Sequence, residues 1–313
     1  MILTQDEKRI CHCEERSDAA ISSNLTRNGL NQIPNTDDQL PTIIFRYMFY
    51  THYTTNRSSL ITIYLEVYIL KIGIIADIHS NREALEAVLD ELINIEQFYC
   101  MGDIIGYGAD PIYCVEKMKK INCLCIKGNH EGAITGELDL YYFNEYAKQS
   151  LEWTMKQLRQ QELHYIHGLP KKVDIAKDIL GVHGSPRQPL WEYILDEQTA
   201  EEIFNKFDFK IYFIGHSHVP GYFTFHRKNR IIKYFEATAG ADLVLDDEHS
   251  YIVNCGSVGQ PRDGNPQASY VLYDSEKGAI YIKRVSYPIN TAQKKIIKAN
   301  LPNFLAERLA LGI

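Results

Sequence analysis

The stretch LKIGIIADIHSNREALEAVLDEL, Leu70 to Leu92, places a strand pattern directly before a helix pattern. The run KIGIIA is continuously apolar and of strand length, which suits a strand covered on both faces. Apolar residues then recur with helical spacing at Leu85, Val88, Leu89 and Leu92. Ser80 is the expected N-cap, and Glu83 completes a capping box. The polar side chains of Asp77 and His79, at the end of the strand, need an explanation from the rest of the chain.

The elements that follow predict an α/β sheet. The segment FYCMG is a second strand, residues 110–120 form a helix, and NCLCIKG is a third strand. This βαβαβ order is typical of parallel neighbours in one sheet. A helix is expected over residues 144–164, and further strands near residues 179–183 and 210–215.

The second half of the chain has a different pattern. It contains short strands separated by turns, which indicates mostly antiparallel pairing: GYFTFH, IIKYFEA, SYIVNCG, ASYVLYD and AIYIKRVSY. Residues 292–311 are expected to be helical. With no internal repeat and no low-complexity linker after Lys71, one domain with two sheets fits better than two independent domains.

Composition limits the class of protein. The 313 residues are 45% hydrophobic and 23% charged, which is ordinary for a globular protein. A net charge of −7 argues against general nucleic-acid binding, which needs a basic face. Seven cysteines, an odd number, argue against a disulfide framework. We expect Cys123 and Cys125 to be small buried residues of a strand rather than metal ligands.

Residues 1–69 differ from the remainder, being polar or irregular and without sustained period. We interpret them as a disordered or non-native extension and residues 70–313 as the folded domain, with the natural chain beginning near Leu70. No ordered secretory signal is present, and the apolar run from Leu60, which contains Glu66, is too short to span a bilayer. A cytoplasmic protein without a membrane partner is therefore expected. The triplet Cys11–Cys13 has no second pair nearby and is rejected as a metal site.

Chemically active side chains follow several predicted strands. The candidates, in chain order, are Asp77, His79, Asp103, Asn129, His130, His183, His216 and His218. Each stands at the C-terminal end of an apolar run, the edge at which open α/β sheets build their sites. Alone, each group would be read as a turn, a cap or a surface histidine. Together they favour one site.

The residue types in this set are suited to metal ions. Oxygen and imidazole ligands without thiolates fit divalent Mn, Fe, Zn, Co or Ni. The ligand candidates are too many for one four-coordinate zinc ion. They suit two ions that share a carboxylate.

The series D-x-H, G-D, G-N-H-E, V-H-G and G-H-x-H resembles the calcineurin-like metallophosphoesterase superfamily, over about residues 71–286. Blocks such as IADIHSN, GDIIGYGADP and NCGSVGQPRDG are most similar to its small bacterial and archaeal phosphodiesterase branch. The resemblance implies an α/β (α+β) fold, a four-layer αββα sandwich of two mixed β-sheets flanked by helices. It implies a dinuclear-metal-dependent phosphoesterase.

The resemblance also implies a role for each matched residue. One metal would be held by Asp77, His79 and His218, the other by Asn129, His183 and His216, with Asp103 bridging them. A metal-bridging hydroxide would attack phosphorus in line with the leaving oxygen. His130 would face the substrate as an acid or charge stabiliser. Glu131 either orients His130 or is a solvated loop carboxylate.

One block departs from the protein serine/threonine phosphatases of the superfamily. The segment GDIIGYG has Gly106 and Tyr107 where that branch has an Asp-Arg pair, and its arginine binds phosphate. This argues against a protein phosphatase. Arg187 and Arg262 are the alternative phosphate-binding candidates, and for each a solvated surface arginine is the competing interpretation.

We therefore predict hydrolysis of phosphodiester or phosphomonoester bonds in a small phosphorylated substrate. The alternatives are a dinucleoside polyphosphate hydrolase, a protein phosphatase, or a non-catalytic scaffold, as in a retromer subunit of this fold that lacks the catalytic histidine. The presence of His130 and of all seven ligand positions weighs against a scaffold. Residues Tyr141, Tyr142 and Trp153 either cap a nucleobase or pack in the core. A homo-oligomer is compatible with the sequence.

Overall fold

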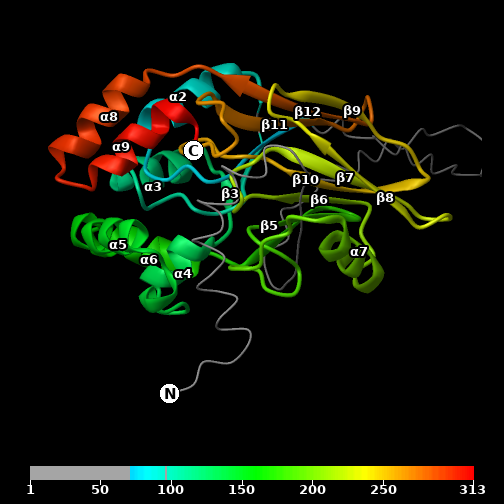
Figure 1. Cartoon of the computed structure of the whole chain (residues 1–313), viewed down its shortest axis with the longest axis horizontal. Helices are drawn as coiled ribbons and strands as arrows, with labels where there is room; N and C mark the ends of the chain where they lie inside the picture. Colours follow the sequence, from blue (N-terminus) through cyan, green and yellow to red (C-terminus); the bar gives the residue numbers. More distant parts are fainter. Residues whose placement is uncertain (1–70, 96) are drawn as a thin grey trace, which may run out of the picture.

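The computed structural model describes residues 71–95 and 97–313 (Figure 1). The predicted extension over residues 1–69 lies outside the described residues. One sheet contains β1 (Lys71–Ile75), β2 (Gln97–Cys100), β3 (Leu124–Cys125), β9 (Ala241–Val244), β11 (Ala268–Asp274) and β12 (Ala279–Val285). The other contains β4 (Lys172–Ala176), β5 (Ile179–Val182), β6 (Ile211–Ile214), β7 (Gly221–His226), β8 (Ile231–Glu236) and β10 (His249–Asn254).

Helices flank the two sheets. They are α2 (Arg82–Glu91), α3 (Pro111–Lys120), α4 (Asn129–Ile134), the 3-10 turn η1 (Leu140–Tyr142), α5 (Glu145–Gln157), α6 (Gln160–Gly168), α7 (Glu197–Lys206), α8 (Ile289–Lys298) and α9 (Asn303–Leu311). Helix α7 packs on β7 and β8, whereas α2 packs on β11 and β12 and against α8 (Figure 1). Throughout the part of the chain that the structure describes, every helix is too short or too polar to cross a membrane.

Both sheets are mixed. The first has the order β3-β2-β1-β11-β12-β9 and the second β4-β5-β6-β10-β7-β8. Strands β1, β2 and β3 are parallel, as the βαβαβ pattern predicts, and β5, β6 and β10 are parallel in the second sheet. The antiparallel strands of the second half extend both sheets instead of forming a separate one. The predicted αββα sandwich is confirmed.

Strand β1 shows why its sequence is apolar on both faces. Ile72 and Ile74 belong to the core between the sheets, and Ile75 belongs to the core beneath the helices, which also contains Leu85 and Val88 of α2. Because side chains alternate across a strand, a strand in a middle layer is apolar at the positions that both faces bury, here from Ile72 to Ile75. This burial fixes the register of β1 and so the position of the polar residues after it.

The start of α2 differs from the prediction. The N-cap is Asn81, whose Oδ1 accepts the N–H of Ala84 at 3.2 Å, so the predicted cap at Ser80 is wrong. Ser80 has a φ of 53° and belongs to the loop that follows β1. A residue in this left-handed conformation does not serve as the N-cap of the helix, because N-cap residues typically have extended backbone.

Two predicted helices are each divided in two. The helix expected over residues 144–164 is broken at Leu158 and Arg159, which are extended, and Glu162 then forms a capping box that starts α6. The C-terminal helix is broken at residues 299–302, which contain Pro302 before α9. Proline disfavours helical backbone in the residue before it, which explains the second break.

Candidate metal centre

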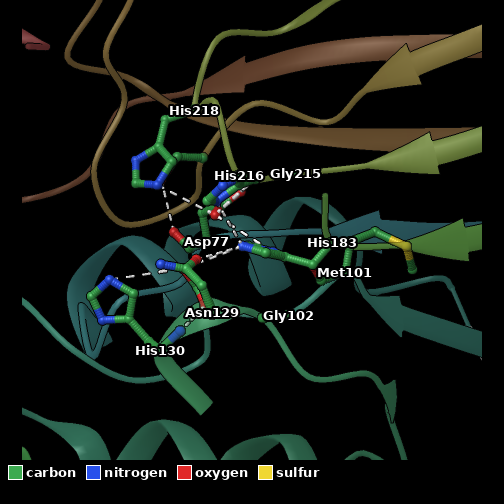
Figure 2. A network of polar contacts seen from close by, with 12 residues as sticks. Asp77, Met101, Gly102, Asn129, His130, His183, Gly215, His216 and His218 are labelled. Carbon is green, nitrogen blue, oxygen red and sulfur yellow. Dashed lines mark hydrogen bonds and ion pairs between the residues drawn. The ribbon is translucent and has the colours of Figure 1, made fainter. Parts of the chain in front are cut away.

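The polar groups predicted from the strand ends lie together at one edge of the sandwich. In the first sheet, Asp77 and His79 follow β1, and Asp103 follows β2. In the second sheet, His183 follows β5, and His216 follows β6. The carboxyl ends of these parallel strands converge from both sheets, so side chains distant in the sequence point at one another (Figure 2).

The side chains form two halves. The aspartate half consists of Asp77, His79 and His218, and the asparagine half consists of Asn129, His183 and His216. Ligand atoms of the aspartate half and of Asp103 lie within 4.8 Å of one another, and so do those of Asp103, His183 and His216. Asn129 joins the second group through its Oδ1, which lies 2.9 Å from Nε2 of His183. The structure therefore brings together all seven predicted ligands, with Asp103 in both groups.

Each of the four histidines has one nitrogen committed to a backbone carbonyl. The contacts are His79 Nδ1 to Ile105 O (3.1 Å), His183 Nδ1 to Met101 O (2.8 Å), His216 Nε2 to Trp191 O (3.1 Å) and His218 Nδ1 to Gln260 O (2.6 Å). A carbonyl oxygen only accepts, so these nitrogens donate. In a neutral imidazole the second nitrogen then carries a lone pair.

The remaining nitrogens face one another in pairs. Nε2 of His79 lies 3.1 Å from Nε2 of His218, and Nε2 of His183 lies 3.1 Å from Nδ1 of His216. Two lone pairs at this distance repel, and no hydrogen bond can join two neutral imidazoles that both donate elsewhere. A cation held by the two nitrogens of each pair would remove the repulsion. Carbonyl-anchored imidazoles are also the usual arrangement around bound metal ions.

Burial shifts the pKa values of the carboxyls and imidazoles of the cluster. Burial raises the pKa of the Asp77 and Asp103 carboxyls well above the usual value. Burial also lowers the pKa of His183 to about 3 and keeps the pKa values of His79, His216 and His218 well below 6.5. The imidazoles are therefore neutral near pH 7, as metal ligation requires. The donor set fits two divalent cations of the borderline or hard type.

The backbone of the site is strained. Five of the proposed ligands have left-handed backbone, with φ between 46° and 68°: Asp77, His79, Asp103, His216 and His218. This conformation costs an L-residue about 1–2 kcal/mol. Such strain persists only where the surroundings determine it, and it gathers at functional sites.

Hydrogen bonds between loops hold this strained backbone. The N–H of Asp77 donates to Gly102 O at 3.0 Å, and the N–H of His79 donates to Asp103 O at 2.9 Å. The carboxylate of Asp77 in turn accepts the N–H of His216 at 3.0 Å, which links the two sheets. These hydrogen bonds fix the ligand loops to one another.

His130 lies beside the candidate metal ligands. Its Nε2 is 4.0 Å from Oδ2 of Asp103, and its ring makes an edge contact with His79 at 4.7 Å between centroids. Its Nδ1 is buried without a hydrogen-bond partner among the described residues. A Cβ on Gly106 would lie 2.0 Å from this nitrogen, so only glycine at position 106 leaves room for the ring. Burial lowers the pKa of His130 well below 6.5.

Glu131 has neither of the roles considered from the sequence. It is fully buried, so it is not a solvated loop carboxylate, and its hydrogen bonds go to backbone N–H groups rather than to the ring of His130. The spacing from Gly128 to Glu131 is that of an N-cap and its third helical residue, which is the signal that could have predicted a buried cap.

The two candidate arginines have different environments. Arg262 is buried beside the site, where its backbone N–H donates to His218 O at 3.3 Å and its guanidinium contacts the Tyr107 hydroxyl at 3.3 Å. Arg187 instead forms ion pairs with Glu192, at 2.7 Å, and with Glu202. The structure brings Arg262 to the metal centre and directs the Arg187 guanidinium towards two carboxylates, so we leave Arg187 out of the site.

Two of the three aromatic residues considered as a nucleobase cap pack against the core, and the third is exposed. Trp153 and Tyr142 are half-buried against the core beneath the helices, and Tyr141 is exposed. Other aromatic rings approach the metal centre: Tyr193 stacks on His216 with centroids 3.8 Å apart, and Phe143 meets His130 edge-on at 5.7 Å.

The chain is similar in sequence and fold to known proteins. The family model described as the calcineurin-like phosphoesterase superfamily domain matches residues 70–278. The uncharacterized protein MJ0912 of Methanocaldococcus jannaschii is 39% identical over 247 residues, covering 77% of this chain and 98% of that protein. The crystal structure of a metallophosphoesterase from Sphaerobacter thermophilus is 37% identical, with a TM-score of 0.70, covering 79% of this chain and 100% of the other.

A more distant structure shares the fold. A hypothetical protein from Pyrococcus horikoshii is 21% identical with a TM-score of 0.62, covering 78% of this chain and 99% of the other. The αββα sandwich therefore persists where much of the sequence has changed.

Proposed function

Since this chain belongs to the calcineurin-like phosphoesterase superfamily, we propose that it hydrolyses phosphodiester or phosphomonoester bonds with two divalent metal ions. The observation that carries the proposal is the pairing of imidazole lone pairs at 3.1 Å in both halves of a buried cluster that shares Asp103. A divalent cation between the two nitrogens of each pair would satisfy both lone pairs.

The proposed metal ions are assigned to the two halves. Asp77, His79 and His218 would hold one, Asn129, His183 and His216 the other, and Asp103 would bridge them. Two such ions, when bound, would neutralise charge on the phosphoryl oxygens and lower the pKa of a bound water towards neutrality.

His130 is the proposed acid or charge stabiliser. It follows Asn129 directly, so it stands next to a proposed metal ligand, and its backbone N–H donates to Asp103 Oδ1 at 2.9 Å. Its Nε2, which lies 4.0 Å from Asp103 Oδ2, is the nitrogen that would face a leaving-group oxygen. A positioned proton donor of this kind contributes about 10²–10⁴ in rate.

Arg262 is the proposed contact for a phosphate oxygen. Tyr107, which replaces the arginine of the protein phosphatases, lies against the Arg262 guanidinium, with 5.6 Å from the guanidinium carbon to the ring centroid. Arg262 would therefore place a guanidinium, which is a planar cation, near the position where the protein phosphatases have an arginine and this chain has Tyr107. The interaction with Gln260 Oε1, at 3.0 Å, helps to orient this guanidinium.

A chromogenic assay tests the proposal. Metal-stripped protein is supplied with Mn²⁺, Co²⁺ or Ni²⁺ and assayed with a bis-aryl phosphate and with the corresponding mono-ester. We expect metal-dependent release of the phenol from at least one of them, and its loss in His218→Ala but not in the matched variant His226→Ala, which alters a histidine of β7 outside the cluster. If neither ester is turned over with any of the three metals, a general phosphoesterase is excluded, leaving the scaffold or a narrow substrate.

A further inference from the structure

The carboxylate of Glu131 joins two separate loops of the metal centre. Its Oε2 accepts the N–H groups of Gly128 and Asp103, each at 2.8 Å. Its Oε1 accepts the N–H groups of Ile104 at 2.9 Å and Ile105 at 3.2 Å. Four backbone donors thus converge on one fully buried side chain.

The two loops carry ligands of different kinds. The Asp103–Ile105 loop follows β2 and begins with the carboxylate shared by both halves. Gly128 precedes Asn129, the amide ligand of the asparagine half. A return contact closes the connection, since Oδ1 of Asp103 accepts the N–H of His130 at 2.9 Å. A Cβ at position 128 would lie 2.0 Å from this same Oδ1, so the two loops are as close as glycine permits.

Glu162 provides an internal comparison. It is also fully buried and also the third residue of a helix, and it accepts the N–H of its own cap, Arg159, at 2.9 Å. Its other hydrogen bonds are to Arg159 and Gln161, within the same helix start. Glu131 makes the same cap contact and, in addition, reaches three N–H groups of another loop. Helix capping alone does not explain this reach.

We propose that Glu131 is a positioning residue that fixes the separation of the two metal positions by clamping the Asp103 loop to the start of α4. The inference rests on the proposed two-metal function. A glutamine at this position offers one acceptor oxygen and an amide whose N–H₂ would face backbone N–H donors. At least two of the four contacts would be lost and the loop would shift, so the shared carboxylate would no longer lie between both halves.

Direct metal binding tests this role. Mn²⁺ is titrated into metal-free full-length protein and followed by electron paramagnetic resonance, which also reports whether two Mn²⁺ ions are coupled by exchange. The wild type is expected to bind two coupled ions. In Glu131→Gln we expect at least one dissociation constant to rise about 10–100-fold and the coupling to change, as for other residues that orient metal ligands.

Two further variants keep the result interpretable. Glu131→Asp retains the charge, but its side chain is one methylene shorter, so we expect it to weaken Mn²⁺ binding as well. It replaces Glu131→Gln in the experiment if the glutamine variant does not fold. Glu162→Gln removes a matched buried cap and leaves both the dissociation constants and the coupling unchanged. Wild-type binding and coupling in the two Glu131 variants overturns the proposal, as does an equal loss in Glu162→Gln, which indicates general destabilisation.

The same titration separates this inference from the proposed function. A wild type that does not bind two Mn²⁺ ions contradicts the metal centre itself. A wild type that binds two coupled ions, with Glu131 variants that do the same, contradicts only the positioning role.

Discussion

The two halves of the metal centre are built differently. The aspartate half contains a carboxylate, and all three of its residues have left-handed backbone, with φ of 54°, 46° and 62°. The asparagine half contains a neutral amide, and within it only His216, with a φ of 68°, has this conformation. One half thus combines more charge with more strain, and the other is neutral and mostly relaxed.

The difference indicates unequal metal affinities. An extra carboxylate near a buried cation is worth more than an amide dipole, because Coulomb attraction is large where water is excluded. The loops around Asp77 are joined by hydrogen bonds, which hold the aspartate half in its binding geometry. We therefore expect the aspartate half to bind the tighter ion and the asparagine half the weaker one.

The largest expected effect comes from the residue that the halves share. Asp103→Ala removes the proposed bridge, so both ions are lost together and turnover falls by about 10³-fold or more, since each ion contributes several kcal/mol to transition-state stabilisation. Elemental analysis and the chromogenic assay measure the two effects. Retention of both ions would show that Asp103 is not shared.

The next effect separates chemistry from metal binding. His130→Ala is expected to keep both ions, because its ring nitrogens belong to neither half, and to lower kcat by about 10²–10⁴. Steady-state kinetics at saturating metal give the value. An unchanged kcat would remove His130 from the mechanism, and loss of metal would assign it to one of the halves instead.

A charge exchange tests the inequality of the halves directly. Asp77→Asn is expected to raise the dissociation constant of the tighter ion at least about tenfold, while Asn129→Asp tightens the weaker one. Calorimetric titration of Mn²⁺ resolves both steps. Unchanged dissociation constants in both variants, or tighter binding in Asp77→Asn and weaker binding in Asn129→Asp, would mean that charge does not set the order of binding.

The smallest expected effect is on the unfolding free energy, through ion pairs of the segment that precedes Asn129. Lys127, two residues before Asn129, forms an ion pair with Glu137 at 2.5 Å, and Lys171 contacts the same carboxylate at 2.5 Å. Although burial raises it, these lysines lower the pKa of Glu137 to about 2. Because the folded pKa lies below the unfolded value of 4.5, the contribution to stability is complete above pH 4.5 and is lost as the pH falls towards 2.

Glu137→Gln should therefore lower the unfolding free energy by about 0–1 kcal/mol at pH 7, as is usual for partly exposed pairs, with a smaller difference at pH 3. Urea unfolding at the two pH values measures it. The exposed Glu276→Gln, which removes a carboxylate outside these ion pairs, is the control and should leave the unfolding free energy unchanged. A loss that is as large at pH 3 as at pH 7 would exclude the ion pairs as its cause.

The sequence predicted the convergence of the site because the relevant constraints are local. A buried strand such as β1 fixes its own register, so the residues directly after it must lie at the carboxyl edge of the sheet. Residues such as Asp77 and His183 are therefore recognisable from an apolar run and the polar residue that ends it.

What the sequence did not predict depends on contacts between distant segments. The four donors around Glu131 come from two loops, and periodicity contains no information about a carboxylate that reaches another loop. The ion pairs of Arg187 with Glu192 and Glu202 likewise exist only in three dimensions. The left-handed backbone of Ser80, imposed by the ligand loop, moved the helix cap to Asn81, which overrode the local capping pattern.

The most direct test is an anomalous-difference map from crystals grown with Mn²⁺. We predict two peaks in each molecule, one contacting Nε2 of His79 and of His218, the other contacting Nε2 of His183 and Nδ1 of His216, with an oxygen of Asp103 between them. A single peak, or peaks away from these nitrogens, would contradict the two-metal centre.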